Sequence, residues 1–229
     1  MIETVIFDID NTLYDFNQAH AVAFKALQAY AERNLGMSAE AFADLHRETM
    51  KKLAEYMGNV AAFHNRIIRY QNILEGRGIS LHPHVLKMDE LYWNTLIDAA
   101  VPFDGAQEIM GLLKKQGIRI GIGTDMTARI QFRKLTRLGL LPYVDFLVSS
   151  EEAGAEKPAL VFFEYCVKKA GCKASECLFV GDSLEKDVLG PAAAGMQAVW
   201  YCPQTPGDKA DVPMIEKLTQ LSQIVEKLS

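Results

Sequence analysis

Two aspartates, Asp8 and Asp10, are separated by one residue and directly follow the apolar run at residues 5–7. Side chains alternate along a strand, so the two carboxylates stay close together where the strand leaves the sheet. Two like charges at the end of a buried strand need a cation, a proton or hydrogen bonds. A hard divalent cation meets this need best. The alternative is an aspartate pair that only caps a turn and the following helix.

Further polar residues follow other predicted strands. They are Thr124 and Asp125 after the strand predicted at 118–123, Lys157 in the loop after the strand predicted at 146–149, and Asp182 after the strand predicted at 178–180. Ligands of parallel sheets bind outside the carboxyl ends of the strands. We therefore expect these residues to converge in space with Asp8 and Asp10.

The expected convergence gives a site that suits a magnesium ion and an anionic ligand. Its acids are Asp8, Asp10, Asp182 and Asp187. Magnesium prefers oxygen ligands and commonly binds through one or two carboxylates plus a substrate phosphate. Thr124 and Lys157 would hold the remaining phosphate oxygens. An aspartate can also act as a nucleophile and form an aspartyl phosphate, while a second one acts as acid and then as base.

The elements that position these residues indicate an α/β fold. From residue 104 onward, strands alternate with helices, which predicts a doubly wound, mostly parallel, Rossmann-like sheet with helices on both faces. The first of these helices could be capped by Asp104, with Gln107 in the capping-box position. Apolar residues spaced between Ile215 and Leu228 predict a terminal helix.

Residues 17–98 show helical periodicity throughout, with four apolar stripes separated by glycines or proline. Four helices with short connections predict a small four-helix bundle. We therefore predict a core made of residues 1–16 and 99–229, and an inserted helical domain at 17–98.

The composition is that of an acidic globular protein. The chain has 229 residues, 49% hydrophobic and 23% charged, with a net charge of −5. We expect no nucleic acid partner and no membrane association, and the absence of a leader-like segment predicts a cytoplasmic location. The cysteines form no Cys-x-x-Cys pair, so we expect free thiols at Cys166, Cys172, Cys177 and Cys202.

Across essentially its whole length, the chain resembles the haloacid dehalogenase superfamily in its phosphatase branch. The motifs that carry the resemblance occur in the family's order: Asp8-Ile-Asp10-Asn-Thr12, the strand-end Thr124, Lys157-Pro158, and Gly181-Asp182-Ser183 followed by Asp187. The family is known for a Rossmann-like core, and the insert resembles its helical cap domain, which closes over the core.

The resemblance implies a role for each matching residue. It implies Asp8 as nucleophile and magnesium ligand, Asp10 as general acid and base that also ligates through its backbone carbonyl, Asp182 as magnesium ligand, Asp187 as support for the metal, and Thr124 and Lys157 as phosphoryl-binding residues. Asp125 stands where the family often has asparagine. We place it with the phosphate-binding group and leave its role open.

Three residues of the predicted cap are candidates for substrate specificity, namely His64, Arg66 and Arg69. The two arginines are three residues apart on a predicted helix and share a face. They could form a solvated basic face or a clamp for a second anionic group of the substrate. The remaining histidines show no metal-ligand spacing and are interpreted as surface or capping residues: His20, His46, His82 and His84.

The resemblance predicts a magnesium-dependent phosphatase for a small-molecule phosphate monoester, such as a nucleotide or sugar phosphate. Asp10 argues against a dehalogenase, because a halide leaving group needs no proton. A sugar-phosphate mutase and a non-hydrolytic phosphate-binding regulator remain alternatives. A dinucleotide-binding dehydrogenase, suggested by Gly121-Ile-Gly123, is discounted because Met126 replaces the third glycine. The protein is expected to be a monomer or a homodimer.

Overall fold

The computed structural model describes residues 1–58, 60–203 and 212–228. By its internal contacts the chain divides into two compact units. The core unit contains Met1–Asp15 and Val101–Ser229, and the helical unit contains Phe16–Ala100. Each unit is described by itself. Among the described residues, no helix combines the length and the apolar character needed to cross a membrane.

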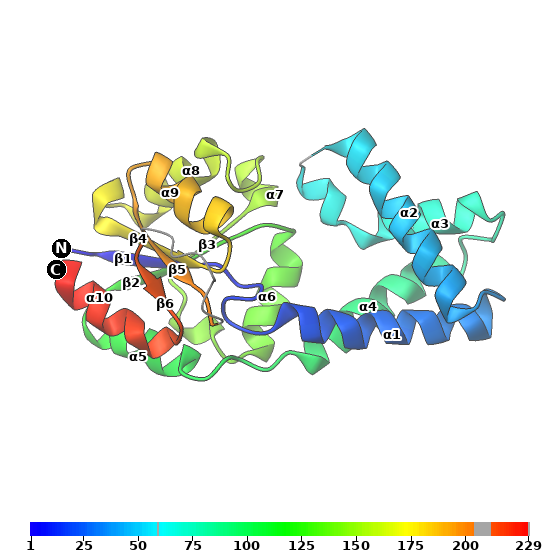
Figure 1. The fold of residues 1–229 in the computed structure, drawn as a ribbon, viewed down its shortest axis with the longest axis horizontal. Coiled ribbons are helices and arrows are strands. Elements are labelled where there is room, and N and C mark those ends of the chain that lie inside the picture. The colour runs from blue at the N-terminus through cyan, green and yellow to red at the C-terminus, as the bar shows by residue number, and fades with distance from the viewer. Residues whose placement is uncertain (59, 204–211, 229) are drawn as a thin grey trace. The chain divides into compact units, whose positions relative to one another are not determined.

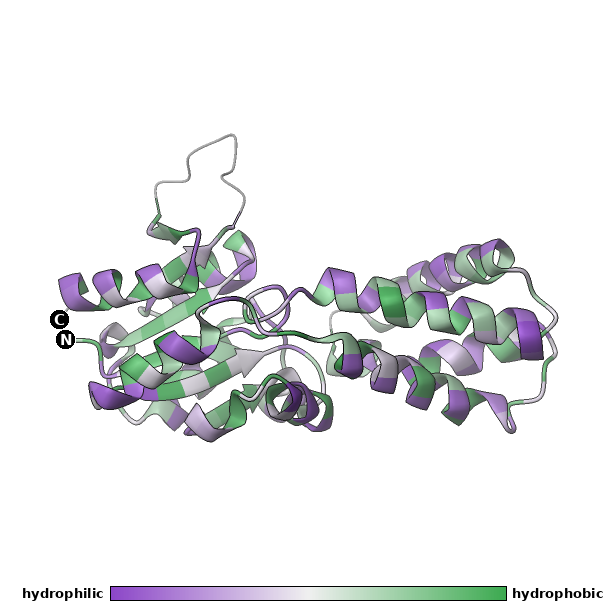
Figure 2. Cartoon of the chain, turned by 90° about the horizontal axis from the view of Figure 1, so that it is seen from below, coloured by the Kyte–Doolittle hydropathy of each residue, from purple (hydrophilic) through white to green (hydrophobic). Residues whose placement is uncertain are grey.

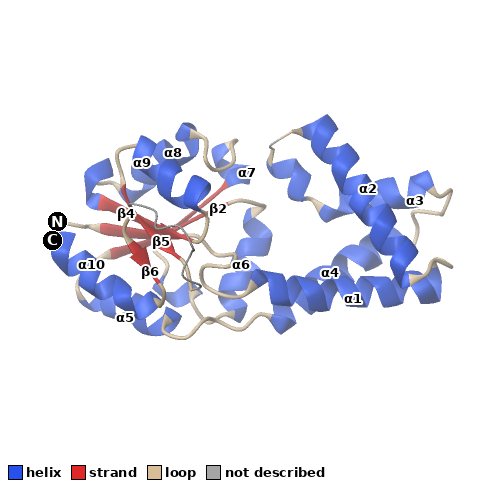
Figure 3. Ribbon diagram, viewed as in Figure 1, coloured by secondary structure: helices blue, strands red, loops and turns tan. Residues whose placement is uncertain are grey.

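The core unit is built on a parallel sheet, as predicted (Figure 3). Its described strands are β1 (Thr4–Phe7), β2 (Arg119–Thr124), β3 (Phe146–Ser149), β4 (Cys177–Gly181), β5 (Gln197–Tyr201) and β6 (Met214–Ile215). Their order in the sheet is β3-β2-β1-β4-β5-β6. The chain thus winds outward from β1 in one direction and then from β4 in the other, which is the doubly wound arrangement.

Helices cover both faces of this sheet. Those of the core unit are α5 (Ala106–Lys115), α6 (Ala128–Arg137), α7 (Ser150–Ala153), α8 (Leu160–Ala170), α9 (Gly190–Ala193) and α10 (Leu221–Leu228). In Figure 1, α8 and α9 lie on one face, and α5 and α10 on the other. Strands buried on both faces become continuously apolar. Accordingly, every residue of β1 and of β4 is buried.

The strand register sets which residues meet at the carboxyl edge. Phe7, the last residue of β1, pairs with Ile122 of β2 on one side and Val180 of β4 on the other. The residues that follow these positions therefore emerge side by side. Asp8 lies between the end of β2 and the end of β4.

The capping box predicted at Asp104 is wrong. Helix α5 begins at Ala106, and its N-cap is Gly105, which has a φ of 81° and makes no side-chain cap. The left-handed conformation suits glycine, so this residue takes the cap position. The Gln107 amide instead donates a hydrogen bond to the carbonyl oxygen of Leu138.

The helix predicted to begin at Ile215 begins later. Met214 and Ile215 form β6, which pairs with the outer edge of β5. Without β6, the edge of β5 would leave backbone groups unpaired. The Cys202 amide at the end of β5 donates a hydrogen bond to the carbonyl oxygen of Ile215 and so joins the two strands. Helix α10 starts only at Leu221. The apolar residues that predicted this helix do face the interior, because Ile215, Leu221 and Val225 are all buried.

The helical unit contains the four predicted helices. They are α1 (Phe16–Asn34), α2 (Ala39–Met57), α3 (Arg66–Gly76) and α4 (His84–Ala99), with a 3₁₀ turn at Ala61–His64. Each helix carries a hydrophobic and a hydrophilic side (Figure 2). The Ser38 hydroxyl accepts a hydrogen bond from the Ala41 amide and so caps α2. The buried side chains include Leu27, Phe42, Tyr70, Leu74, Tyr92 and Leu96.

Candidate active site

Asp8 and Lys157 form the centre of the site. The Lys157 Nζ donates to Oδ1 of Asp8 and to Oδ1 of Asp187, each at 2.7 Å, and lies 3.3 Å from the carbonyl oxygen of Gly123. Asp8, Lys157 and Asp187 are all buried. One ammonium group therefore holds two carboxylates that are distant in the sequence.

Asp125 positions the loop that carries Lys157. Its Oδ1 accepts a hydrogen bond from the backbone amide of Lys157 at 3.0 Å, and its Oδ2 accepts one from Lys186 Nζ at 2.8 Å. Both carboxylate oxygens are thus engaged in holding the site together. The sequence did not indicate this structural role.

Three carboxylates gather at this edge of the sheet. Asp8, Asp182 and Asp187 each offer an oxygen, and these oxygens lie within 4.8 Å of one another. A Cβ at position 181 would come within 2.4 Å of the Asp187 carboxyl carbon, so only a glycine leaves room for that carboxylate. The Asp187 side chain is further fixed by the Ser183 amide, which donates to its Oδ2 at 3.0 Å.

The electrostatics of this cluster follow from burial and crowding. Burial raises the pKa of Asp8 to about 8, against the opposing effect of Lys157 and with a further contribution from Asp187. Burial, followed by the charge of Asp187, raises the pKa of Asp182 to about 6. Burial alone would lower the pKa of Lys157, but the carboxylates of Asp187 and Asp8 outweigh it, and that pKa is raised.

The donor set fits a magnesium ion. Lys157 donates to two of the three carboxyl groups, those of Asp8 and Asp187, so full ionisation of all three would leave the cluster with an excess of negative charge. Magnesium takes hard oxygen ligands and commonly binds through one or two carboxylates, which this cluster can supply. Burial and the nearby carboxylates make ionisation of these acids unfavourable. A bound divalent cation would offset their negative charge and favour the ionised form.

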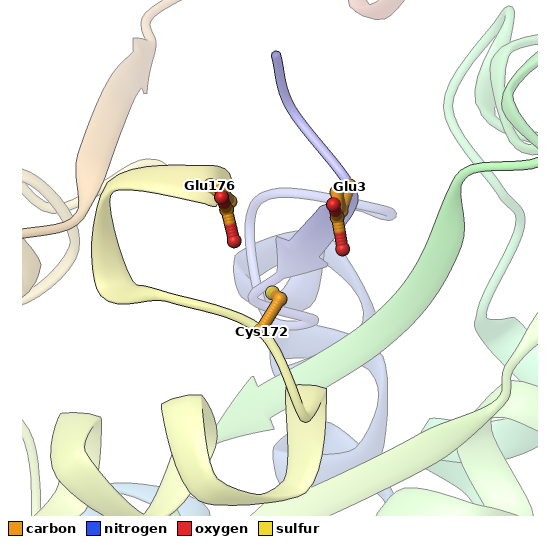
Figure 4. Close-up of side chains that lie close together, drawn as sticks. All are labelled: Glu3, Cys172 and Glu176. Carbon is orange, nitrogen blue, oxygen red and sulfur yellow. The ribbon is translucent and has the colours of Figure 1, made fainter.

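A second grouping of possible ligands lies elsewhere in the core unit. Glu3, Cys172 and Glu176 also place ligand atoms within 4.8 Å of one another (Figure 4). Glu3 and Glu176 immediately precede β1 and β4, so this group is at the amino ends of the strands, opposite to Asp8. Glu176 already accepts a hydrogen bond from the backbone amide of Lys173. Because Glu3, Cys172 and Glu176 lie at the amino ends of the strands, their group is separate from the candidate active site.

Asp10 is held by two donors that the sequence analysis missed. Lys134 Nζ lies 2.7 and 2.8 Å from its two carboxylate oxygens, and the Tyr14 hydroxyl donates to Oδ1 at 2.7 Å. Lys134 is fully buried on α6. The available signal was its spacing, because Lys134 is four residues from the buried Ile130 and so falls on the apolar face of that helix.

Thr124 ends β2 and is buried with its hydroxyl hydrogen-bonded. Its Oγ1 accepts from Gln131 Nε2 at 2.8 Å and donates to the carbonyl oxygen of Asp125 at 3.2 Å. Gln131 is another residue that the sequence analysis missed. Thr12 is also buried, and its hydroxyl donates to Oδ1 of Asp182 at 3.4 Å.

The arginines of the helical unit do not form a solvated basic face, so that alternative is wrong. Arg66 and Arg69 are each only 6% exposed. The guanidinium of Arg66 stacks 3.6 Å from the ring centre of Tyr92, and that of Arg69 lies 5.2 Å from the ring centre of Phe63. Packing against aromatic rings draws these side chains into the unit. His64 lies edge-on to Phe63, with ring centres 5.8 Å apart.

Two histidines interpreted as surface or capping residues are part of the same interior. His20 Nδ1 and the Tyr92 hydroxyl are hydrogen-bonded at 2.8 Å, and His46 packs edge-on against Phe24 with ring centres 5.0 Å apart. Burial, followed by the charges of Arg66 and Arg69, lowers the pKa of His20 to about 4 and that of His46 to about 3. Aromatic neighbours in the bundle account for the difference from the prediction.

The fold and the carboxylate cluster define a class of α/β enzymes that use acids at the carboxyl edge of a parallel sheet. Residues 2–195 match the haloacid dehalogenase-like hydrolase family. This confirms the resemblance, and the chain belongs to that family.

Individual relatives extend over nearly the whole chain. Over 215 residues it is 35% identical to ribulose-1,5-bisphosphate 5-phosphatase of Halopiger xanaduensis, covering 92% of this chain and 89% of the relative. It is 29% identical to glyceraldehyde 3-phosphate phosphatase of Methanothermobacter thermautotrophicus, covering 98% and 100%. A magnesium-bound crystal structure of the HAD-hydrolase YfnB from Bacillus subtilis has a TM-score of 0.73 at 25% identity, covering 98% of this chain and 99% of that chain.

Proposed function

We propose that this enzyme is a magnesium-dependent phosphatase that hydrolyses a small phosphate monoester through an aspartyl phosphate. The observation that carries the proposal is the buried Asp8 carboxylate, clustered with Asp182 and Asp187 and hydrogen-bonded to Lys157. The two relatives named as phosphatases support it.

Asp8 and Asp10 divide the chemistry between them. An oxygen of the Asp8 carboxylate attacks phosphorus, the bond from phosphorus to the ester oxygen breaks, and Asp10, which enters this step protonated, gives its proton to the leaving oxygen. Asp10 then takes a proton from water, and the water oxygen attacks phosphorus, which releases phosphate and restores Asp8. Lys134 and Tyr14 keep the Asp10 carboxylate in place through both steps.

The remaining residues would hold the phosphoryl group and the metal. Asp8, Asp182 and the backbone carbonyl of Asp10 would ligate magnesium, with Asp187 in support. When bound, the metal offsets the charge of the phosphoryl oxygens. Lys157 and Thr124 would bind those oxygens as well, which is catalysis by positioning and electrostatic stabilisation. The carboxylate of Asp125 holds the loop of Lys157.

Hydrolysis of p-nitrophenyl phosphate with and without magnesium tests the proposal. Asp8→Asn removes the nucleophile, and we expect at least about a 10³-fold loss of kcat with magnesium present. Chelation of magnesium should abolish the wild-type rate. Asp104→Asn is the matched control, because Asp104 is exposed and lies outside the site. If Asp8→Asn kept most of the wild-type rate, the nucleophile would have been assigned incorrectly.

The natural ester is a separate question from the reaction. A panel of nucleotide, sugar and organic acid phosphates, ranked by kcat/KM, identifies the substrate class. Release of one inorganic phosphate for each ester consumed distinguishes a phosphatase from a mutase and from a binding protein that turns nothing over. We also propose a cytoplasmic location, which the four free cysteines support, because reducing compartments keep thiols unpaired.

A further inference from the structure

Two cysteine side chains meet at the amino ends of the central strands, on the edge of the sheet opposite to Asp8. Cys172 lies in the loop after α8, and Cys177 is the first residue of β4. Their Sγ atoms are 3.4 Å apart. Two thiolates on one tetrahedral zinc ion lie about 3.8 Å apart, because each Zn–S bond is about 2.3 Å long. The two sulfurs are therefore already close to the spacing that one metal ion requires.

Two glutamates bring the number of candidate ligands to four. One carboxylate oxygen of Glu3, one of Glu176 and the Cys172 sulfur all lie within 4.8 Å of one another. In Figure 4, the Cys172 sulfur points toward the space between the two glutamate side chains. Structural zinc sites are almost always four-coordinate, and thiolate and carboxylate are both among the ligands of zinc. With Cys177, the cluster supplies the number and the kinds of ligand that such a site needs.

The segments that carry these ligands are joined by the backbone. The Glu3 amide donates a hydrogen bond to the carbonyl oxygen of Glu176 at 2.9 Å, which links the residue before β1 to the residue before β4. Oε2 of Glu176 accepts from the Lys173 amide at 2.8 Å, so this carboxylate is held in place. Lys173 Nζ lies 3.4 Å from Oε1, but the lysine side chain is 81% exposed and can turn into solvent. Ligands held in this way lose little conformational entropy when an ion binds.

The surroundings of the two sulfurs favour a bound cation over a free thiolate. Cys177 is fully buried, and burial, followed by its hydrogen bond with Cys172, raises the pKa of its thiol. This thiol therefore keeps its proton at neutral pH unless a metal ion takes the place of that proton. The Thr4 hydroxyl is also buried and lies 3.6 Å from Cys172 Sγ. Hydrogen bonds to the ligands of a metal orient them and strengthen the site.

We propose that Cys172, Cys177, Glu3 and Glu176 form a structural zinc site that fastens the start of β1 to the start of β4. Binding forms two Zn–S bonds and releases two thiol protons to the solvent, with no change in oxidation state. Thiolate ligands select zinc over magnesium, which prefers oxygen. The protein fills all four positions, which is the arrangement of a structural and not a catalytic zinc ion. The site lies apart from Asp8, so the proposal does not depend on the proposed phosphatase activity.

Titration with cobalt(II) tests the site by absorption spectroscopy. The full chain is kept reduced with a phosphine, because a disulfide between Cys172 and Cys177 would remove both sulfur ligands. A thiolate-to-cobalt charge-transfer band should appear, and added zinc should displace the cobalt and abolish the band. Cobalt bound by oxygen ligands alone, as in the cluster of Asp8, gives no such band. Absence of the band in a large molar excess of cobalt would overturn the proposal.

Substitutions assign the band to individual ligands. Cys172→Ser and Cys177→Ser should each reduce its intensity by about half or more, since each removes one of two thiolates. Glu3→Gln should keep both sulfurs but raise the Kd for cobalt at least about tenfold. Cys202→Ser is the matched control, because Cys202 is a partly exposed free cysteine outside the cluster. A band of full intensity in Cys172→Ser, or an equal loss in Cys202→Ser, would contradict the assignment.

Thermal unfolding in zinc provides a second readout. An ion that binds only the folded site raises Tm as its concentration increases. Because zinc could also bind the cluster of Asp8, the measurement is the difference between wild type and Cys172→Ser. The zinc-dependent rise in Tm should be smaller in Cys172→Ser and unchanged in Cys202→Ser, and circular dichroism without metal shows whether each variant is folded. Equal rises in wild type and Cys172→Ser would show that zinc does not join the two strands.

Discussion

Lys134 is a residue of the candidate site that the sequence did not indicate. A lysine on the apolar face of a helix is ordinarily unfavourable, because a buried ammonium needs a counter-charge. Here the counter-charge is Asp10, and Lys134 Nζ contacts both of its oxygens. The Tyr14 hydroxyl completes the set. Lys134 is therefore a positioning residue for the proposed acid and base, and it does not need to touch the substrate.

Replacement of Lys134 should affect turnover more than binding. Lys134→Met keeps the length of the side chain and removes its ammonium group, which leaves the Tyr14 hydroxyl to hold the Asp10 carboxylate among the contacts described above. We expect kcat to fall about 10- to 100-fold with less than about a twofold change in KM, since a misaligned general acid loses part of its catalytic contribution. Initial rates on p-nitrophenyl phosphate measure this. Lys115→Met, at the exposed end of α5, is the control. A raised KM with normal kcat would contradict a role in positioning Asp10.

At the scale of elements, we expect the stability of the helical unit to depend on pH through His20 and His46. Burial and the charges of Arg66 and Arg69 lower the pKa values of His20 and His46 to about 4 and about 3 in the folded protein. In the unfolded chain both have the ordinary value of about 6.5. As the pH falls below 6.5, the unfolded state therefore takes up protons that the folded state does not.

The helical unit should consequently lose stability between pH 6.5 and pH 4. Thermal unfolding across this range measures the loss as a falling Tm. His46→Leu removes one of the groups that must stay neutral, so its Tm should fall less steeply than that of the wild type. His82→Leu is the control, because His82 is exposed in the same unit. Identical slopes for wild type and His46→Leu would show that this histidine does not couple folding to pH.

The elements also show where local sequence patterns are sufficient and where they are not. The strand at 146–149 is as predicted, since it depends on a short run of residues. The cap of α5 and the strand β6 are not. The first depends on the backbone conformation of Gly105, and the second on the free edge of β5, which is formed by a distant part of the chain.

At the scale of the whole molecule, the core unit joins two stretches of sequence on either side of the helical insert. The first stretch supplies β1, which pairs with β2 and β4 of the second. Asp8 and Lys157 are thereby brought to 2.7 Å although 149 positions separate them. The carboxylate cluster exists only when both stretches are folded together, so a ligand of the cluster should stabilise the entire core.

Magnesium should therefore raise the unfolding temperature of the protein. A ligand that binds only the folded state stabilises it in proportion to the logarithm of its concentration above Kd. We expect Tm to increase with magnesium concentration in the wild type. In Asp182→Asn, which removes one proposed ligand, the same Tm increase should require at least about tenfold more magnesium. Asp104→Asn should respond as the wild type does. An equal response in Asp182→Asn would show that Asp182 does not bind the metal.

The sequence by itself determined the α/β core, the helical insert and the strand-end positions of Asp8, Asp10, Thr124 and Asp182. The helices and strands follow from the local periodicity of apolar residues. The shared position of the aspartates and Thr124 follows from the topology, because parallel strands present their carboxyl ends at one edge of the sheet. Only the tertiary structure decided that Lys134 and Tyr14 hold Asp10, that Asp125 holds the Lys157 loop, and that Arg66 and Arg69 are buried. The reason is that a side chain's partner across the fold depends on packing between distant segments, which no local pattern encodes.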